Sequence, residues 1–234
     1  MRVARSVGAD RALFWYREAM RLWRRGPGTF AALALAMLAS EIALSLIPVV
    51  GTLVAQLVLP LVACGLLYAS LAADRGDRPR ASHIAAIFGA PPRAMLAVIL
   101  SGLVVFAGEA ATAYAIAGTN MLEPFARDTS IAPSTVLATY VVGIAVSLPV
   151  TFVPFSALFD DVGIADAFAE SWRGFARNVP AMLLYGALSI ALLLLGWATY
   201  GVGLLLALPW WAASSYAAWK DVFGVAASGG VAAV

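Results

Sequence analysis

The sequence has very few of the residues on which most enzymes and metal sites depend. Its 234 residues include one cysteine, one histidine and one lysine, and only 12% are charged. The single cysteine, Cys64, excludes an intrachain disulfide. The lone His83 has no cysteine or carboxylate at ligand spacing, so we expect no metal site. A G-x-S-x-G elbow and a phosphate loop with its lysine are also missing. We therefore expect no catalytic residues and no cofactor. The formal charge of +2 gives no indication of a nucleic-acid partner.

Hydrophobic residues make up 62% of the chain, well above the level of soluble domains. They fall into blocks of about 20 residues, the length that a helix needs to cross a bilayer. The sequence thus predicts an all-α integral membrane protein with a single membrane domain over 1–234. The six spans that we expect are 28–47, 50–73, 93–118, 134–158, 180–199 and 202–219. Very short connections pair the first two spans and the last two as hairpins, and residues 119–133 form a longer connection between the third and fourth spans.

Basic residues are distributed unevenly around these spans. Of the 15 Lys and Arg residues, only Arg127 falls on one side of the predicted bilayer. Basic residues near spans are retained on the cytoplasmic side, so we expect both termini there, with 220–234 as a short cytoplasmic tail.

Two cytoplasmic segments have helical amphipathic patterns. Within the N-terminal segment 1–27, residues 11–25 place aromatic and aliphatic side chains opposite arginines, and residues 164–177 repeat the pattern. A shorter example is 82–88. Aromatic residues opposite arginines favour helices in the headgroup region, with the bilayer and its anionic headgroups as partners. The candidate headgroup contacts are Arg17, Arg21, Arg24, Arg25, Arg173 and Arg177.

An internal threefold repeat is also predicted. Each odd-numbered span begins near a proline, and each even-numbered span has a Leu-Pro pair followed after 12 to 14 residues by an aspartate. We therefore predict three units, each with an interfacial helix, an outward span and an inward span. The alternative is that proline is simply frequent in transmembrane helices. The prolines of these pairs, which are candidate helix kinks, are Pro60, Pro149 and Pro209, and the aspartates are Asp74, Asp161 and Asp221.

Two acidic residues, Glu41 and Glu109, lie well inside predicted spans. A charge near the bilayer centre costs at least about 2.5 kcal/mol, so each needs compensation. Gln56 should lie level with Glu41, and Tyr140 level with Glu109. The four residues form a candidate intramembrane polar site for a proton or a cation. Alternatively, they are neutral, hydrogen-bonded groups that fasten the hairpins.

The end of the last span has a distinctive pattern. Residues 213–224 read ASSYAAWKDVFG, and Asn178, Pro180 and the pair Leu208-Pro209 precede them. Over residues 167–224 the chain resembles a family of bacterial inner-membrane proteins whose last span ends S-x-Y-x-[SA]-[YW]-[KR]-D-[IV]-F. The resemblance implies a multi-span protein of the bacterial inner membrane and implies no activity.

These observations lead to two main hypotheses. The first is a non-enzymatic membrane protein that moves or permits passage of a small solute, an ion or a lipid. The second is a membrane scaffold or assembly factor that binds anionic lipid, a protein partner or a second copy of itself. A membrane-embedded enzyme would require a water-filled pocket with converging polar groups.

Overall fold

A computed structural model describes residues 2–47, 50–122 and 132–225, and within these residues the chain forms helices and no strands. The elements in chain order are α1 (Arg11–Trp23), α2 (Pro27–Ser45), α3 (Val50–Arg75), the 3-10 helix η1 (Ala81–Gly89), α4 (Pro92–Ala117), α5 (Pro133–Ser147), the 3-10 helix η2 (Leu148–Val150), α6 (Val153–Phe159), α7 (Ile164–Arg177), α8 (Val179–Ala198) and α9 (Leu204–Phe223).

Five segments are long and apolar enough to cross a membrane. They are α2, α3, α4, the continuous stretch formed by α5 and η2, and α8. The predicted helical membrane protein is therefore confirmed at this level. The sixth predicted span corresponds to α9. Among the described residues, α9 is not one of the helices that are long and apolar enough to cross a membrane. Lys220 and Asp221 lie in the last turn of α9, and the helix continues to Phe223.

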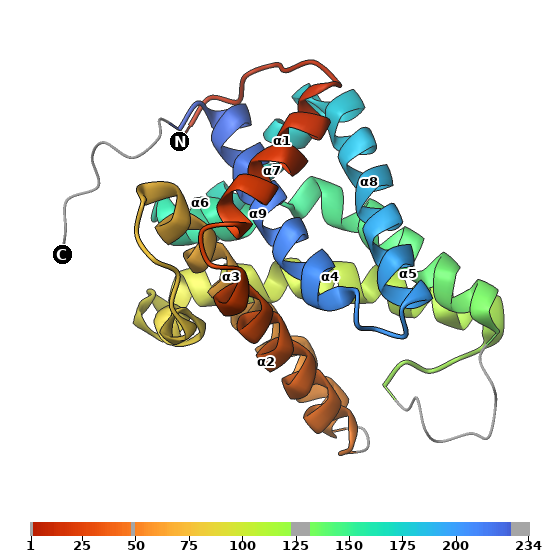
Figure 1. Ribbon diagram of the computed structural model, residues 1–234. Helices are drawn as coiled ribbons and strands as arrows, with labels where there is room; N and C mark the ends of the chain where they lie inside the picture. Colours follow the sequence, from red (N-terminus) through yellow and green to blue (C-terminus); the bar gives the residue numbers. More distant parts are fainter. Residues whose placement is uncertain (1, 48–49, 123–131, 226–234) are drawn as a thin grey trace.

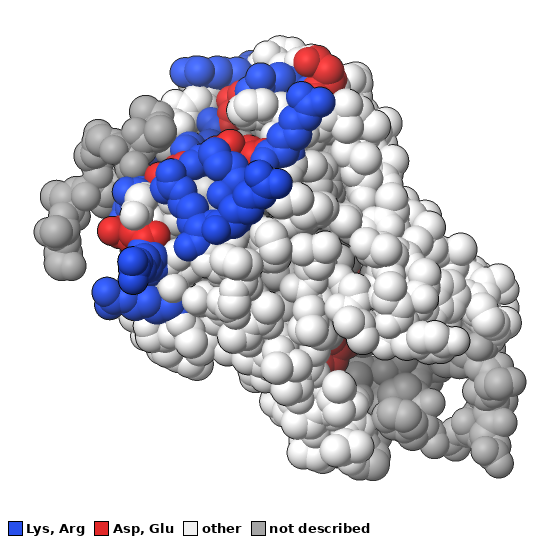
Figure 2. Space-filling model, in the orientation of Figure 1, with Lys and Arg blue, Asp and Glu red and all other residues white. Residues whose placement is uncertain are grey.

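Neighbouring helices pair along the chain. Helix α2 packs against α3, α4 against α5, and α8 against α9. Figure 1 shows that the α2 and α3 pair and the α4 and α5 pair diverge from a common region around α1, α6 and α7. Figure 2 shows that basic and acidic side chains gather at this same end. We call it the charged end, and the tips of the diverging pairs the opposite end.

Prolines shape several of these helices. Pro27, Pro92 and Pro133 each occupy the first position of a helix, where a missing N–H costs nothing. Pro60 and Pro209 lie inside continuous helices. The span predicted over 134–158 is not one continuous helix, because the chain changes to 3-10 geometry around Pro149, one of the candidate kinks, before α6 begins. A proline removes a backbone hydrogen bond and clashes with the preceding turn, which explains the break.

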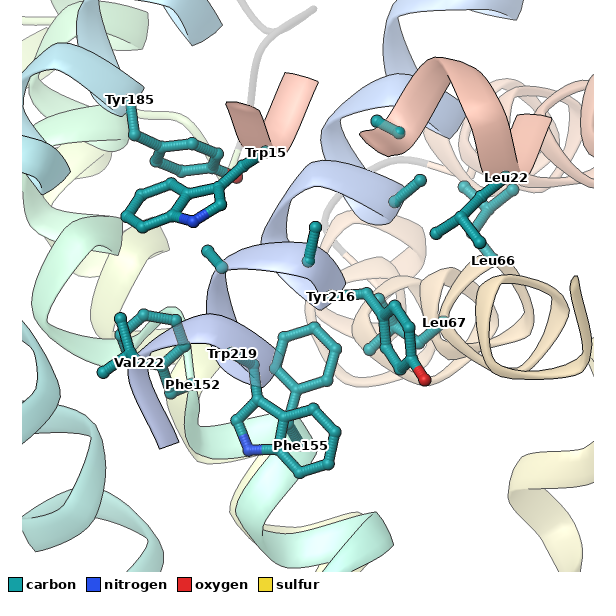
Figure 3. Close-up of a cluster of buried hydrophobic side chains, with 14 of the residues drawn as sticks. Trp15, Leu22, Leu66, Leu67, Phe152, Phe155, Tyr185, Tyr216, Trp219 and Val222 are labelled. Carbon is teal, nitrogen blue, oxygen red and sulfur yellow. The ribbon is translucent and has the colours of Figure 1, made fainter. Parts of the chain in front are cut away.

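Helix α9 is the centre of the hydrophobic core. Most of its last eleven residues are buried, and large side chains from α1, α3, α6 and α8 converge on it (Figure 3). The ring of Phe155 stacks on that of Trp219 with centroids 5.5 Å apart. A helix surrounded by other helices contacts little lipid. The serines of α9 can therefore stay inside the protein, where each donates to a carbonyl of its own helix.

Helix α1 packs on this core more deeply than a headgroup helix would. Its most extensive contacts are with α9, and Ala12, Trp15, Ala19 and Leu22 are completely buried. The expectation that its aromatic face lies mainly among lipid headgroups needs correction, because Trp15 forms part of the protein core. Leu13 and Phe14, on the other side of the helix, remain about half exposed.

Helix α7 packs in the opposite sense. Its buried face consists of Ala167, Glu170, Ser171 and Gly174, while Trp172 is 57% exposed. Gly174 lies so close to the rings of Phe152 and Phe223 that a Cβ would contact both. Small residues therefore bring α7 against the bundle. Trp172 faces away from it, whereas Ile164, Phe168 and Phe175 are partly buried against neighbouring residues.

Candidate functional site

A cavity of about 290 Å³ lies in the middle of the bundle, at the lower end of the size range for small-molecule sites. Residues of α2, α3, α4, α5, η2, α6, α8 and α9 line it, among them the candidate kink Pro60. The native cysteine Cys64, one turn along α3, also lines this cavity. We call it the central cavity.

The walls of the central cavity are almost entirely apolar. The hydroxyl groups of Ser101, Ser147, Thr151 and Ser215 line it, but each donates to a backbone carbonyl of the preceding helical turn. Their protons are therefore already engaged. No charged side chain of residues 2–47, 50–122 and 132–225 lines the central cavity. The cavity thus suits an apolar group better than water or a hydrated ion.

Three of the four predicted intramembrane residues come together. The carboxyl groups of Glu41 and Glu109 lie within electrostatic range of each other, and both lie within range of the Tyr140 hydroxyl. The fourth, Gln56, lies half-buried in the facing part of α3. We call Glu41, Gln56, Glu109 and Tyr140 the polar cluster. Its members come from α2, α3, α4 and α5, so it joins the two diverging helix pairs.

The polar cluster continues the central cavity toward the opposite end. On three helices, a cavity residue lies four positions from a cluster residue. The pairs are Met37 and Glu41 on α2, Pro60 and Gln56 on α3, and Val105 and Glu109 on α4. Residues four apart share a helix face and are about one turn, or 5.4 Å, distant along the axis. In each case the cluster residue is on the side away from the charged end. These three helices therefore place Glu41, Gln56 and Glu109 directly beyond the cavity.

The Glu109 side chain also depends on a glycine. Gly143, one turn before the cavity residue Ser147 on α5, lies so close to the Glu109 carboxyl that a Cβ at this position would overlap it. The glycine thus leaves room for the carboxyl between α4 and α5. This contact fixes where the acidic group lies, and a pattern of spans could not have shown it.

The three aspartates of the predicted repeat all form ion pairs at the charged end. Asp74 pairs with Arg21 of α1 and with Lys220 of α9, and it also accepts a hydrogen bond from the Tyr216 hydroxyl. Asp161 pairs with Arg93, and Asp221 pairs with Arg11. Asp221 also accepts a hydrogen bond from the indole of Trp15. The side chain of Asp74 is only 4% exposed, so its pairs are shielded from solvent.

A segment that sequence reasoning missed ties the N-terminus to the last third of the chain. The buried Asn178 accepts from the Val7 amide at 2.7 Å and donates to the carbonyls of Arg5 and Gly174 at 2.8 and 2.9 Å. The Arg5 amide donates to the carbonyl of Val222. We call residues 2–8 the N-terminal strap. Asn178 is part of the pattern on which the family resemblance rests, but only the fold reveals its hydrogen-bond partners.

The predicted headgroup arginines have mixed surroundings. Arg17 and Arg24 are exposed, whereas Arg21 pairs with Glu18 and Asp74. Three others donate to backbone carbonyls: Arg25 to Ala73, Arg173 to Ala169 and Arg177 to Ala4. Arg127 lies outside the described residues.

Burial changes the protonation of several groups at the charged end. It raises the pKa of Asp160 above its ordinary value, even though Arg2 pairs with this carboxylate. Burial also raises the pKa of Tyr16 to about 12, where the hydroxyl hydrogen-bonds with Ser189. Desolvation, together with the neighbouring Arg80, lowers the pKa of His83. His83 therefore favours its neutral form, and its Nδ1 accepts the Arg80 amide.

Among residues 2–47, 50–122 and 132–225, no three His, Cys, Asp or Glu side chains are placed to hold a metal ion. Comparison with known proteins finds no matching family model, no matching curated protein and no matching solved structure.

Proposed function

We propose that this protein admits a small, mainly apolar solute to its central cavity and permits its passage through the membrane. One observation carries the proposal: the cavity and three members of the polar cluster lie on the same faces of α2, α3 and α4, one turn apart. An apolar chamber with polar groups at one end resembles a binding site with an entrance. The divergence of the two helix pairs supports access from the opposite end.

The proposal includes a topology. We place both termini on the cytoplasmic side of a bacterial inner membrane, with α9 as a sixth span. The gathering of basic side chains at the charged end supports this orientation (Figure 2). The burial of α9 supports its role as a span, because a helix enclosed by others needs less apolar surface. The ion pairs of Asp74, Asp161 and Asp221 support the threefold repeat.

The native cysteine gives a direct test of access to the cavity. We expect methyl methanethiosulfonate, a small neutral reagent, to react with Cys64 in the folded protein in lipid nanodiscs, as measured by intact mass. Ala212 lines the cavity, so the substitution Ala212→Leu should fill part of it and slow the reaction. Ala39→Leu adds the same group at an exposed position on α2 outside the cavity lining, and should leave the rate unchanged.

The proposal fails if Cys64 is inert in the folded wild-type protein but reacts after unfolding in dodecyl sulfate. It also fails if Ala212→Leu and Ala39→Leu react at the wild-type rate. A flux measurement in proteoliposomes extends the test to passage. If the polar cluster couples passage to the movement of protons, the Glu41→Gln, Glu109→Gln double variant should lose the part of the flux that a pH gradient drives.

A second proposal is a scaffold that binds an anionic membrane surface. It is favoured by the exposed Arg17 and Arg24 at the charged end and by the exposed Trp172 of α7. We expect the Arg17→Gln, Arg24→Gln double variant to retain less phosphatidylglycerol than the wild type, as measured by mass spectrometry of the purified protein. Equal retention would count against this second function.

A further inference from the structure

We infer that the solute class is a lipophilic cation, a molecule with an apolar body and one positive charge. The inference rests on the proposed function, because it assigns a ligand to the same cavity. The surroundings that a ligand would meet change along the cavity axis. Apolar walls come first, and two carboxyl groups follow one helical turn beyond them.

The walls select the body of the ligand. No charged group reaches the central cavity, and its serine and threonine hydroxyls donate to their own helices. Aromatic rings of Phe155, Tyr185 and Trp211 form part of the lining. A ring face attracts a cation and excludes an anion, so these walls tolerate a positive charge nearby. Tyr185 is 1% exposed, and its hydroxyl lies near the side chains of Ser189 and Ser214.

The polar cluster selects the sign of the charge. Glu41 and Glu109 are the acidic residues of the cluster, and the described residues of α2 and α5 contain no Lys or Arg. In α3 and α4 the basic residues are Arg75 and Arg93, both at the charged end. Among the described residues, an anion entering from the opposite end would meet carboxyl groups with no basic residue beside them. A cation would supply a partner for these two acids, which no basic side chain in the described part of the chain compensates.

The spacing limits the shape of the ligand. One helical turn separates Met37 from Glu41 and Val105 from Glu109, which is about 5.4 Å along each axis. The charge should therefore lie within one or two bonds of the apolar body. A ring that carries a quaternary ammonium group has this form, and benzyltrimethylammonium is a suitable probe.

Reagents of opposite charge that modify Cys64 test this inference. Trimethylammonioethyl and sulfonatoethyl methanethiosulfonate react alike: the cysteine thiolate attacks the sulfenyl sulfur, a disulfide forms and methanesulfinate leaves. The protein is studied in nanodiscs, where both of its faces meet solvent. At Cys64, the rate of the cationic reagent is divided by the rate of the anionic reagent. This ratio is then divided by the same ratio measured with N-acetylcysteine, which corrects for the intrinsic reactivity of the two reagents.

We expect this normalised ratio to favour the cation by about tenfold or more, because a unit charge several ångströms away has an effect of this size at an effective dielectric constant of about 20. The Glu41→Gln, Glu109→Gln variant should lower the ratio to within about twofold of unity. Glu18→Gln, at the charged end, should leave it unchanged. Benzyltrimethylammonium should protect wild-type Cys64 from the neutral reagent, and this measurement needs no variant.

The outcomes separate the inference from the proposed function. If the neutral reagent reacts with Cys64 but the normalised ratio is near unity, or favours the anion, the lipophilic cation is wrong and the accessible cavity stands. If benzyltrimethylammonium gives no protection, the inference is likewise overturned. If no reagent reaches Cys64 in the folded protein, both proposals fall.

Discussion

The substitution Asn178→Ala should loosen the N-terminal strap and destabilise the whole protein. Asn178 is 1% exposed, and its side-chain amide makes three hydrogen bonds. Two of them reach the strap, at the Val7 amide and the Arg5 carbonyl. The third reaches the Gly174 carbonyl at the end of α7. Alanine would leave one donor and two acceptors without partners.

The expected loss follows from these three bonds. Leaving a buried polar group unsatisfied costs about 1 to 3 kcal/mol, and relaxation of the strap toward water would recover part of that. We therefore expect the free energy of unfolding to fall by about 3 kcal/mol. For a chain of this length such a loss lowers the melting temperature by about 6 to 12 °C.

Two measurements separate the local effect from the global one. Thermal unfolding in detergent, followed by intrinsic tryptophan fluorescence, gives the global loss. Limited trypsin digestion at Arg5 reports on the strap, because cleavage requires the backbone to leave its bonds with Asn178 and Val222. We expect both the lower melting temperature and faster cleavage after Arg5.

A control and a clear refutation are available. Asn120 is exposed and its side chain makes only a local bond to the Leu122 amide, so Asn120→Ala should change the melting temperature by less than about 2 °C. If Asn178→Ala melts like the wild type and is cleaved at the same rate after Arg5, the strap contributes nothing to stability and our reasoning is wrong.

Two further predictions concern the polar cluster and the charged end. Gly143→Ala should displace the Glu109 carboxyl and destabilise the protein by about 1 to 3 kcal/mol. Gly28→Ala, where a Cβ meets open space, should have no effect on stability. Thermal unfolding of the two variants measures the difference. Burial raises the pKa of Asp160, so its stabilising effect is complete below about pH 3.9, the ordinary aspartate value, and is lost as the pH rises through the raised value. Asp160→Asn should therefore flatten the decline in melting temperature between about pH 4 and pH 7, and an unchanged slope would contradict this assignment.

Much of the helical framework could be predicted from the sequence, because the length of a membrane span and the cost of lipid-exposed polar groups impose a strong pattern. The predicted boundary of the first span lies within two residues of α2, and that of the third within one residue of α4. Hydropathy could not reveal the break at Pro149, because the residues around it remain apolar in either geometry.

Amphipathic patterns were less informative about which face is buried. Both sequences place aromatic residues opposite arginines, but Trp15 of α1 is completely buried, whereas Trp172 of α7 is 57% exposed. On α7 the buried face is made of small residues, and Gly174 allows it to approach Phe152 closely. Such close packing depends on shape, and the period of the pattern carries no information about it.

The polar cluster was partly accessible to sequence reasoning. Counting along the spans placed Glu41 and Glu109 at similar depths, but depth alone cannot show whether two helices meet. The structure brings their side chains together and places Met37 and Val105 of the central cavity one turn away. The position of Cys64 in the wall of the central cavity could not be predicted, because nothing in the sequence around it distinguishes it from other apolar residues of the span.

The N-terminal strap has a consequence for the order in which the protein is made. Asn178 is synthesised 171 residues after Val7, and Val222 later still, so residues 2–8 cannot be fixed until these partners have left the ribosome. Helix α1 waits for α9 in the same way, because Asp221 bonds to both Arg11 and Trp15. Residues 2–8 are thus fixed only after α9 has been made. A chain interrupted before α9 would leave an arginine-rich N-terminus unattached, and cellular quality control could recognise it there.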